Sequence, residues 1–308
     1  MRIATYNLQN LRLRRRQGVV ALDGAVDADM GAQSSAVLDV EDRMLAARVI
    51  AAANADLVAL QEVFDRDTLD HFHNRFLRVA DVASYPHRIC LPGNDGRGLN
   101  VAALSRVAPQ AVTSHAAHSG AALGLMDLPP DLRDKPLFRR DCLQLDFAAL
   151  SVFICHFKAP YPDPDRARQV RQAEARGVRA VIERAFEHPA EARWIILGDF
   201  NEPASEASPA ALAPLADGFA VDLMARGGGT PAWTYETPDT HLLSRPDRVL
   251  VSPALATAFP GVVPQVIRQG MAADVRRHGP SPRARLTGRP HASDHALVHV
   301  TFPGLTLT

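Results

Sequence analysis

The sequence predicts an α/β fold in which two β-sheets pack against each other and helices cover their outer faces. Short apolar runs bounded by turn-forming residues indicate strands that are buried on both sides. Amphipathic segments of helical period lie between some of these runs, whereas other runs follow one another without a helix. This mixture favours two packed mixed sheets over one doubly wound sheet. No internal repeat or linker divides the sequence, so we expect one domain over residues 1–308.

Four strands are predicted most directly, and each leads into an acid, an amide or an imidazole. They cover Arg2–Tyr6, Leu57–Leu60, Leu150–Cys155 and Trp194–Leu197. Further strands are expected at Val101–Leu104, Arg248–Val251 and Ala296–Phe302. Strand ends that meet at one edge of a two-sheet core would place their polar side chains in one pocket.

Three helices are predicted from apolar positions at helical spacing. The first covers Glu41–Ala53, with Leu45, Val49 and Ala52 on one face. The second covers Asp67–Ala80, with the stripe Leu69, Phe72, Phe76 and Val79. The third runs from Pro164 to about Glu187, with Asp163 as its N-cap, Pro189 at its end and the stripe Val170, Ala173, Val178, Val181 and Phe186. Long loops are expected at Arg12–Val40, Ala111–Leu137 and Gln265–His291, the last of them rich in arginine.

The composition excludes several classes of protein. Apolar residues make up 47% of the chain and the formal net charge is zero, which argues against a disordered chain and against a strongly basic nucleic-acid-binding protein. No apolar run is long enough to cross a membrane. The three cysteines are odd in number and lack metal-ligand spacing, so we expect neither a disulfide framework nor a zinc site. The N-terminus carries no signal sequence, and we therefore expect a cytoplasmic protein.

Polar residues at the predicted strand ends form a set that suits metal-assisted phosphoryl hydrolysis. The set consists of Asn7, Glu62, His156, Asp199, Asn201, Asp247, Asp294 and His295. Any one of these residues alone would be an ordinary turn former or solvated strand end. Together they offer an oxygen ligand for a hard cation such as Mg²⁺, a carboxylate to orient and deprotonate a water, and donors for a phosphate in the transition state.

The chemistry of each residue type indicates its part in such a site. Glu62 supplies a carboxylate for the cation, and Asp199 can act on the water. Asn201, His156 and His295 can donate hydrogen bonds to the phosphate. An imidazole works best when a carboxylate fixes its tautomer, and either Asp247 or Asp294 could do so.

These residues lie in motifs that resemble the endonuclease/exonuclease/phosphatase superfamily, the fold of deoxyribonuclease I, over essentially the whole chain. The motifs are Thr5-Tyr6-Asn7-Leu8-Gln9, Leu60-Gln61-Glu62-Val63, Cys155-His156-Phe157-Lys158, Gly198-Asp199-Phe200-Asn201, Arg245-Pro246-Asp247 and Ser293-Asp294-His295. The segment Gly98–Arg106 also resembles a strand of that family. The resemblance implies a four-layer α-β-β-α sandwich that hydrolyses phosphoester bonds with Mg²⁺ or Mn²⁺.

The resemblance also implies roles for the site residues. Glu62 would be the main metal ligand with Asn7 beside it, and Asp294 would support the metal or hold an imidazole. Asp199 would orient or activate water, and Asn201 would contact the phosphate. His295 would bind the scissile phosphate, with Asp247 paired to an active-site histidine. His156 would act as a general acid or transition-state donor, as in members with a second histidine; it stands where abasic-site repair members usually have a tyrosine motif, which argues against a repair endonuclease.

The leading functional hypothesis is a metal-dependent phosphodiesterase that acts on nucleic acid. Arg139, Arg140 and Arg277 are the candidate phosphate contacts. The alternative substrate is a phospholipid head group or small phosphate ester, which a neutral protein suits equally well. A non-catalytic binding module is the third hypothesis, and the complete set of catalytic residue types argues against it. No protein partner is implied.

Overall fold

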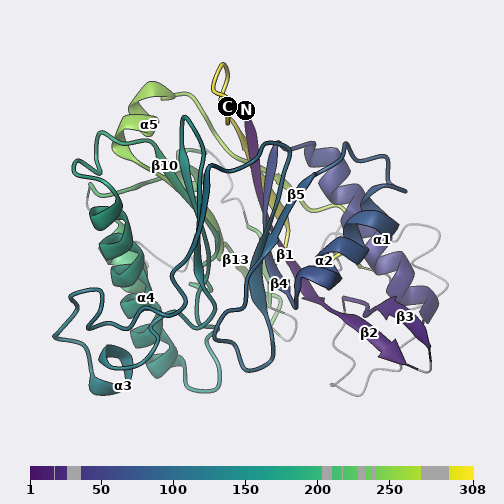
Figure 1. Cartoon of the computed structure of the whole chain (residues 1–308), viewed down its shortest axis with the longest axis horizontal. Helices are drawn as coiled ribbons and strands as arrows, with labels where there is room; N and C mark the ends of the chain where they lie inside the picture. The colour runs from purple at the N-terminus through teal and green to yellow at the C-terminus, as the bar shows by residue number, and fades with distance from the viewer. Residues whose placement is uncertain are drawn as a thin grey trace.

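The computed structural model describes residues 1–16, 18–25, 36–202, 210–216, 218–227, 233–237, 240–271 and 291–308. Within these residues two mixed sheets pack face to face with helices outside them (Figure 1). The strands of the first sheet, in spatial order, are β15 (Gln265–Ile267), β16 (Leu297–Thr301), β1 (Arg2–Leu11), β4 (Leu57–Val63), β6 (Asn100–Ser105) and β5 (His87–Cys90). In this sheet β1 and β4 are parallel, and the other neighbouring pairs are antiparallel.

The second sheet repeats this arrangement. Its strands, in spatial order, are β11 (Val221–Asp222), β14 (Asp247–Val251), β10 (Trp194–Asp199), β9 (Ser151–His156), β8 (Cys142–Asp146) and β7 (Ala111–Ser114). Here β9 and β10 form the parallel pair. Two small hairpins complete the strands: β2 (Leu13–Arg16) with β3 (Val19–Leu22), and β12 (Tyr235–Glu236) with β13 (Leu243–Ser244). All seven predicted strands lie within strands of the two sheets or overlap them.

Three apolar cores separate four layers. The central core lies between the sheets and includes Ile3, Leu57 and Ile195. A second core joins the first sheet to α1 (Ala36–Ala53) and α2 (Arg66–Phe72), and a third joins the second sheet to α4 (Pro164–Ala185). The short helices α3 (Pro130–Arg133) and α5 (Pro253–Ala258) lie between strands in the sequence. The predicted α-β-β-α sandwich is therefore confirmed. No helix in the described ranges has the length and apolar character needed to span a membrane.

The structure corrects two of the predicted helix faces. Ala52 of α1 is exposed, and the buried face carries Val49, Ile50 and Ala53 instead. The helix predicted over Asp67–Ala80 changes after Phe72 into a π-helical turn, His73–Leu77. The helical segment ends at Leu77, three residues before the predicted end, so Leu77 is buried while Val79 lies in the turn that follows and is 69% exposed.

The third helix agrees better with its prediction. The Asp163 side chain accepts a hydrogen bond from the Arg166 N–H at 3.0 Å and caps α4 as expected. The helix ends two residues earlier than predicted, at Ala185, and half-buried Phe186 is its C-cap.

Two of the predicted loops contain regular structure: Arg12–Val40 includes β2, β3 and the start of α1, and Ala111–Leu137 includes β7 and α3. The third begins with β15, and its residues 272–290 lie outside the described residues.

Gly198 permits the close approach of β9 and β10 directly before Asp199. Its φ is +145°, and a Cβ atom there would lie 1.9 Å from the Cys155 carbonyl oxygen. Because that oxygen belongs to a buried strand, Gly198→Ala is expected to lower the free energy of unfolding in urea denaturation by roughly 2–6 kcal/mol, from about 1–3 kcal/mol of overpacking and about 1–3 kcal/mol of backbone strain. Gly261→Ala is the matched control, since no atom lies within 4 Å of its added Cβ. Equal unfolding midpoints for the two variants would contradict this account.

Candidate active site

The ends of both parallel strand pairs meet at one edge of the sandwich. Asn7 pairs in register with Gln61, and Asp199 lies between His156 on β9 and Asp247 on β14. The edge opens into a pocket of about 330 Å³. Its lining includes Glu62, Arg97, Arg140, His156, Tyr161, Asp199, Asn201, Tyr235, Asp294 and His295. The strand ends therefore gather their polar residues as the sequence predicted.

Irregular backbone at the ends of β1 and β4 sets the position of Glu62. The pairing register shifts between Asn7 and Leu11, and Gln9, Asn10 and Glu62 all have positive φ. The Asn10 N–H donates to Glu62 Oε2 at 2.9 Å. Asn7 Nδ2 lies 3.4 Å from Glu62 Oε1 and donates to Asp199 Oδ2 at 3.1 Å, which joins the first sheet to the second.

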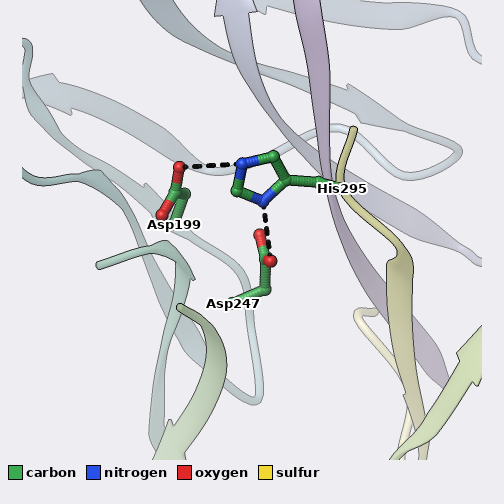
Figure 2. A group of neighbouring side chains, drawn as sticks. All are labelled: Asp199, Asp247 and His295. Atoms are coloured by element: carbon green, nitrogen blue, oxygen red, sulfur yellow. Dashed lines mark hydrogen bonds and ion pairs between the residues drawn. The ribbon is translucent and has the colours of Figure 1, made fainter. Parts of the chain in front are cut away.

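His295 lies between two carboxylates from neighbouring strands (Figure 2). Its Nδ1–H donates to Asp247 Oδ2 at 2.8 Å, and its Nε2 is 3.7 Å from Asp199 Oδ2. Burial alone would lower the pKa of His295, but Asp247, Asp199 and Asp294 together raise it well above its ordinary value. The three carboxylates therefore favour the cationic form of the imidazole.

Two carboxyl groups at the pocket have pKa values above those of ordinary acids. Burial raises the pKa of Asp199 to about 6, against the opposing charge of His295. Burial also raises the pKa of Asp294 to about 6, with a contribution from the negative charge of Glu62. The Asp294 N–H donates to Gln9 Oε1 at 2.9 Å, so Asp294 is tied to the end of β1.

His156 and Asn201 lie on the other side of Asp199. His156 Nε2 is 3.5 Å from Asp199 Oδ2, and burial, followed by the charges of Arg140 and His295, lowers the pKa of His156 well below its usual value. The Asn201 N–H donates to Asp199 Oδ1 at 2.8 Å, and Asn201 Nδ2 donates to the Phe157 carbonyl at 3.0 Å. His156 is therefore a neutral hydrogen-bonding group at pH 7, in contrast to His295.

Comparison with known proteins decides the family. Residues 4–295 match the Endonuclease/Exonuclease/phosphatase family. The chain belongs to this family. Members of the family hydrolyse phosphoester bonds. No curated protein matches the chain.

Solved structures support the fold assignment. Truncated TDP2 from Caenorhabditis elegans is 16% identical, with a TM-score of 0.58 over 97% of this chain and 95% of that one. An AP endonuclease from Archaeoglobus fulgidus is 14% identical, with a TM-score of 0.59 over 98% and 99%. The 3′ phosphatase NExo from Neisseria, bound to a product DNA hairpin, is 20% identical, with a TM-score of 0.53 over 98% and 99%. At these identities the likeness shows the endonuclease/exonuclease/phosphatase fold.

The three arginines proposed as phosphate contacts have different positions in this family member. Arg140 lines the pocket, where its Nη1 donates to the Phe157 carbonyl at 3.0 Å. Arg139 is not part of the pocket lining; its backbone N–H donates to Glu174. Arg277 lies outside the described residues.

Sequence reasoning missed Arg97, Tyr161 and Tyr235, which line the pocket from loops and a short hairpin. The nearest sequence signal was the position of Arg97 directly before the segment Gly98–Arg106.

Two groups of side chains are chemically suited to a divalent cation. Glu62, Asn7 and Asp294 offer oxygen ligands of the kind that Mg²⁺ and Mn²⁺ prefer, and Glu62 and Asp294 both line the pocket. Asp199, Asp247 and His295 also each place one ligand atom within 4.8 Å of the others. In this second group, however, one of the three ligand atoms is an imidazole nitrogen, whereas Mg²⁺ takes oxygen ligands. The first group therefore fits a cation better.

Buried Glu174 on α4 holds the two loops that lead to the site. One carboxylate oxygen accepts from the Arg139 N–H and the other from the Lys158 N–H, each at 2.8 Å. Glu174→Ala leaves two partly buried N–H donors without their acceptor, at a cost of up to about 1–3 kcal/mol each, so urea denaturation is expected to show a loss of about 2–6 kcal/mol. Glu183→Ala on the same helix removes a half-exposed ion pair with Arg179 and is expected to change stability by less than about 0.5 kcal/mol. A Glu174 variant as stable as the Glu183 variant would contradict this role.

Proposed function

We propose that this protein is a Mg²⁺- or Mn²⁺-dependent phosphodiesterase that hydrolyses phosphoester bonds in nucleic acid. The observation that carries the proposal is the convergence, in one pocket, of a carboxylate with a raised pKa, an imidazole with a raised pKa and oxygen ligands for a cation. Family membership supports the reaction class. The fold shared with a Neisseria phosphatase that binds a DNA hairpin supports the choice of nucleic acid.

Asp199 is the proposed general base. It is held by Asn7 and by the Asn201 N–H, and its pKa of about 6 leaves it ionised yet basic enough to accept a proton at neutral pH. As the water oxygen bonds to phosphorus, Asp199 takes the water proton. The ester P–O bond then breaks, and the leaving oxygen takes up a proton, for which the cationic His295 is a source.

The other polar groups stabilise the phosphate. Asp247 orients the His295 ring and favours its cationic form through the 2.8 Å hydrogen bond. His156 is neutral, so we assign it hydrogen-bond donation in the transition state in preference to general acid catalysis. Asn201 and Arg140, whose side chains both donate to the Phe157 carbonyl, also line the pocket and add donors. A cation held by Glu62, Asn7 and Asp294 would supply positive charge against the developing charge of the phosphate.

The test uses purified protein with labelled single-stranded DNA, duplex DNA and RNA. Cleavage is expected with Mg²⁺ or Mn²⁺, with loss of cleavage in chelator and recovery when the cation is restored. The rate should fall with added salt if basic residues bind the phosphate backbone. Protein that leaves all three nucleic acids intact in the presence of both cations would contradict the proposal.

One observation favours the alternative substrate, a phospholipid head group. Leu242 and Leu243 are 66% and 46% exposed on the β12–β13 hairpin, whose residues Tyr235 and Ser244 line the pocket. Exposed apolar side chains beside a catalytic pocket also suit contact with a lipid surface. Assays with sphingomyelin and phosphoinositide vesicles, run beside the nucleic acids, distinguish the two substrates.

We also propose the cytoplasm as the compartment, because Cys90, Cys142 and Cys155 are all free thiols.

A further inference from the structure

Tyr161 is a large aromatic residue placed at the pocket without a role in the core. It follows β9 in the loop that leads to α4, and it lines the pocket together with His156, Asp199 and Asn201. Its side chain is nevertheless 69% exposed. An exposed aromatic ring beside a catalytic centre contributes little to stability but offers a flat apolar face to a ligand.

The backbone around Tyr161 is held in place. Lys158 Nζ donates to the carbonyl oxygen of Ala159 at 2.9 Å and also to that of Tyr161. Pro160 and Pro162 flank Tyr161 and fix their own φ angles. The loop then ends at Asp163, which caps α4. Because the loop is already ordered, it loses less conformational entropy when a ligand packs on the ring.

The pocket lining combines side chains of two kinds. The polar ones include the carboxylates and imidazoles that would act on a phosphoester. The less polar ones are the consecutive residues Ala159, Pro160 and Tyr161, together with Pro246 and Tyr235. The Tyr235 ring packs on the His295 ring with centroids 4.8 Å apart, so the aromatic surface reaches the proposed catalytic imidazole. A ligand that contacts both kinds of side chain has a phosphoester next to a flat apolar group.

We propose that Tyr161 stacks on an unpaired nucleobase next to the scissile phosphate, which makes single-stranded nucleic acid the preferred substrate. This inference rests on the proposed function and names the substrate class of the same site. A base within a duplex has both faces covered by its neighbours, whereas an unpaired base is free to stack on a ring at the mouth of a pocket. A phospholipid head group has no flat aromatic face to stack on the ring; a choline head group would instead place its cation over the ring.

The experiment compares two single-stranded oligonucleotides that each contain one cleavable phosphodiester among methylphosphonate linkages. One has thymine on both sides of the cleavable bond, and the other has abasic sugars there. The value of kcat/KM is measured for the wild type, Tyr161→Ala, Tyr161→Phe and Tyr161→Trp. Met126→Ala is the control, because Met126 is 62% exposed and is not part of the pocket lining. Thermal unfolding of every variant is measured in parallel.

The wild type is expected to prefer the thymine substrate by roughly 5- to 150-fold, the range for stacking of one base on an aromatic ring. Tyr161→Ala should bring this ratio close to one, whereas the Phe, Trp and Met126 variants should keep it. A wild-type ratio near one, or a ratio that survives in Tyr161→Ala, would overturn the stacking proposal while the proposed nuclease function stands. No cleavage of either oligonucleotide, or of ordinary DNA and RNA, would overturn both.

Discussion

Asp199→Asn is expected to lower kcat by about 10²- to 10⁴-fold, the usual contribution of a general base. The substitution keeps the volume of the side chain and an oxygen that can accept from the Asn201 N–H. It removes the basic oxygen that lies 3.1 Å from Asn7 Nδ2 and 3.5 Å from His156 Nε2. The loss should therefore affect the chemical step more than the fold, and single-turnover kinetics with a labelled oligonucleotide will show it.

The same assignment predicts the acid limb of the pH profile. Burial raises the pKa of Asp199 to about 6, and only the ionised carboxylate can accept a proton. The rate should therefore fall as the pH falls through about 6. His295 has its pKa raised well above its ordinary value, so its cationic form persists through neutral pH and the rate should not fall there. A bound cation favours the Asp199 carboxylate and should move the acid limb to lower pH.

Asp127→Asn provides the control for this prediction. Asp127 is an exposed carboxylate paired with Arg176 on α4, and it is not part of the pocket lining. Its loss should leave both kcat and the acid limb unchanged. An Asp199→Asn variant with the kcat of the Asp127 variant, or one that keeps the acid limb of the wild type, would contradict the role of Asp199.

The sequence predicted the proposed catalytic residues because they follow apolar runs directly. An apolar run such as Trp194–Leu197 is visible in the sequence, and its end places Asp199 at the sheet edge. The same reasoning predicted the positions of Asn7, Glu62 and His156 at the sheet edge. Parallel pairing then brings these strand ends together, because β1 and β4 run in the same direction, as do β9 and β10.

Residues on loops could not be placed in this way. Arg139 and Arg140 are neighbours in the sequence, yet Arg140 lines the pocket and Arg139 does not. The difference comes from tertiary contacts, since Glu174 binds the Arg139 N–H while the Arg140 side chain reaches the Phe157 carbonyl. Tyr161 was missed for a similar reason: its position depends on how Lys158 binds the loop carbonyls. Likewise, periodicity alone does not reveal the π-helical turn after which Val79 is exposed.

Glu62→Gln is expected to raise the half-saturating concentration of Mg²⁺ by about 10- to 100-fold. The variant keeps an oxygen near Asn7 and the Asn10 N–H, so the local backbone should hold its shape. It removes the negative charge that makes Glu62 a good ligand for a hard cation. Titration of Mg²⁺ against both cleavage rate and heat of binding, the latter without substrate, measures the change.

Asp247→Asn distinguishes the two groups that could hold the cation. If the cation binds at Glu62, Asn7 and Asp294, then Asp247→Asn should lower kcat through the loss of its charge beside His295 but leave the heat of Mg²⁺ binding unchanged. If the cation binds at Asp199, Asp247 and His295 instead, Asp247→Asn should weaken Mg²⁺ binding and Glu62→Gln should leave it unchanged. We expect the first result, because Mg²⁺ prefers oxygen ligands and a bound cation would offset the negative charge of Glu62 that helps to raise the pKa of Asp294.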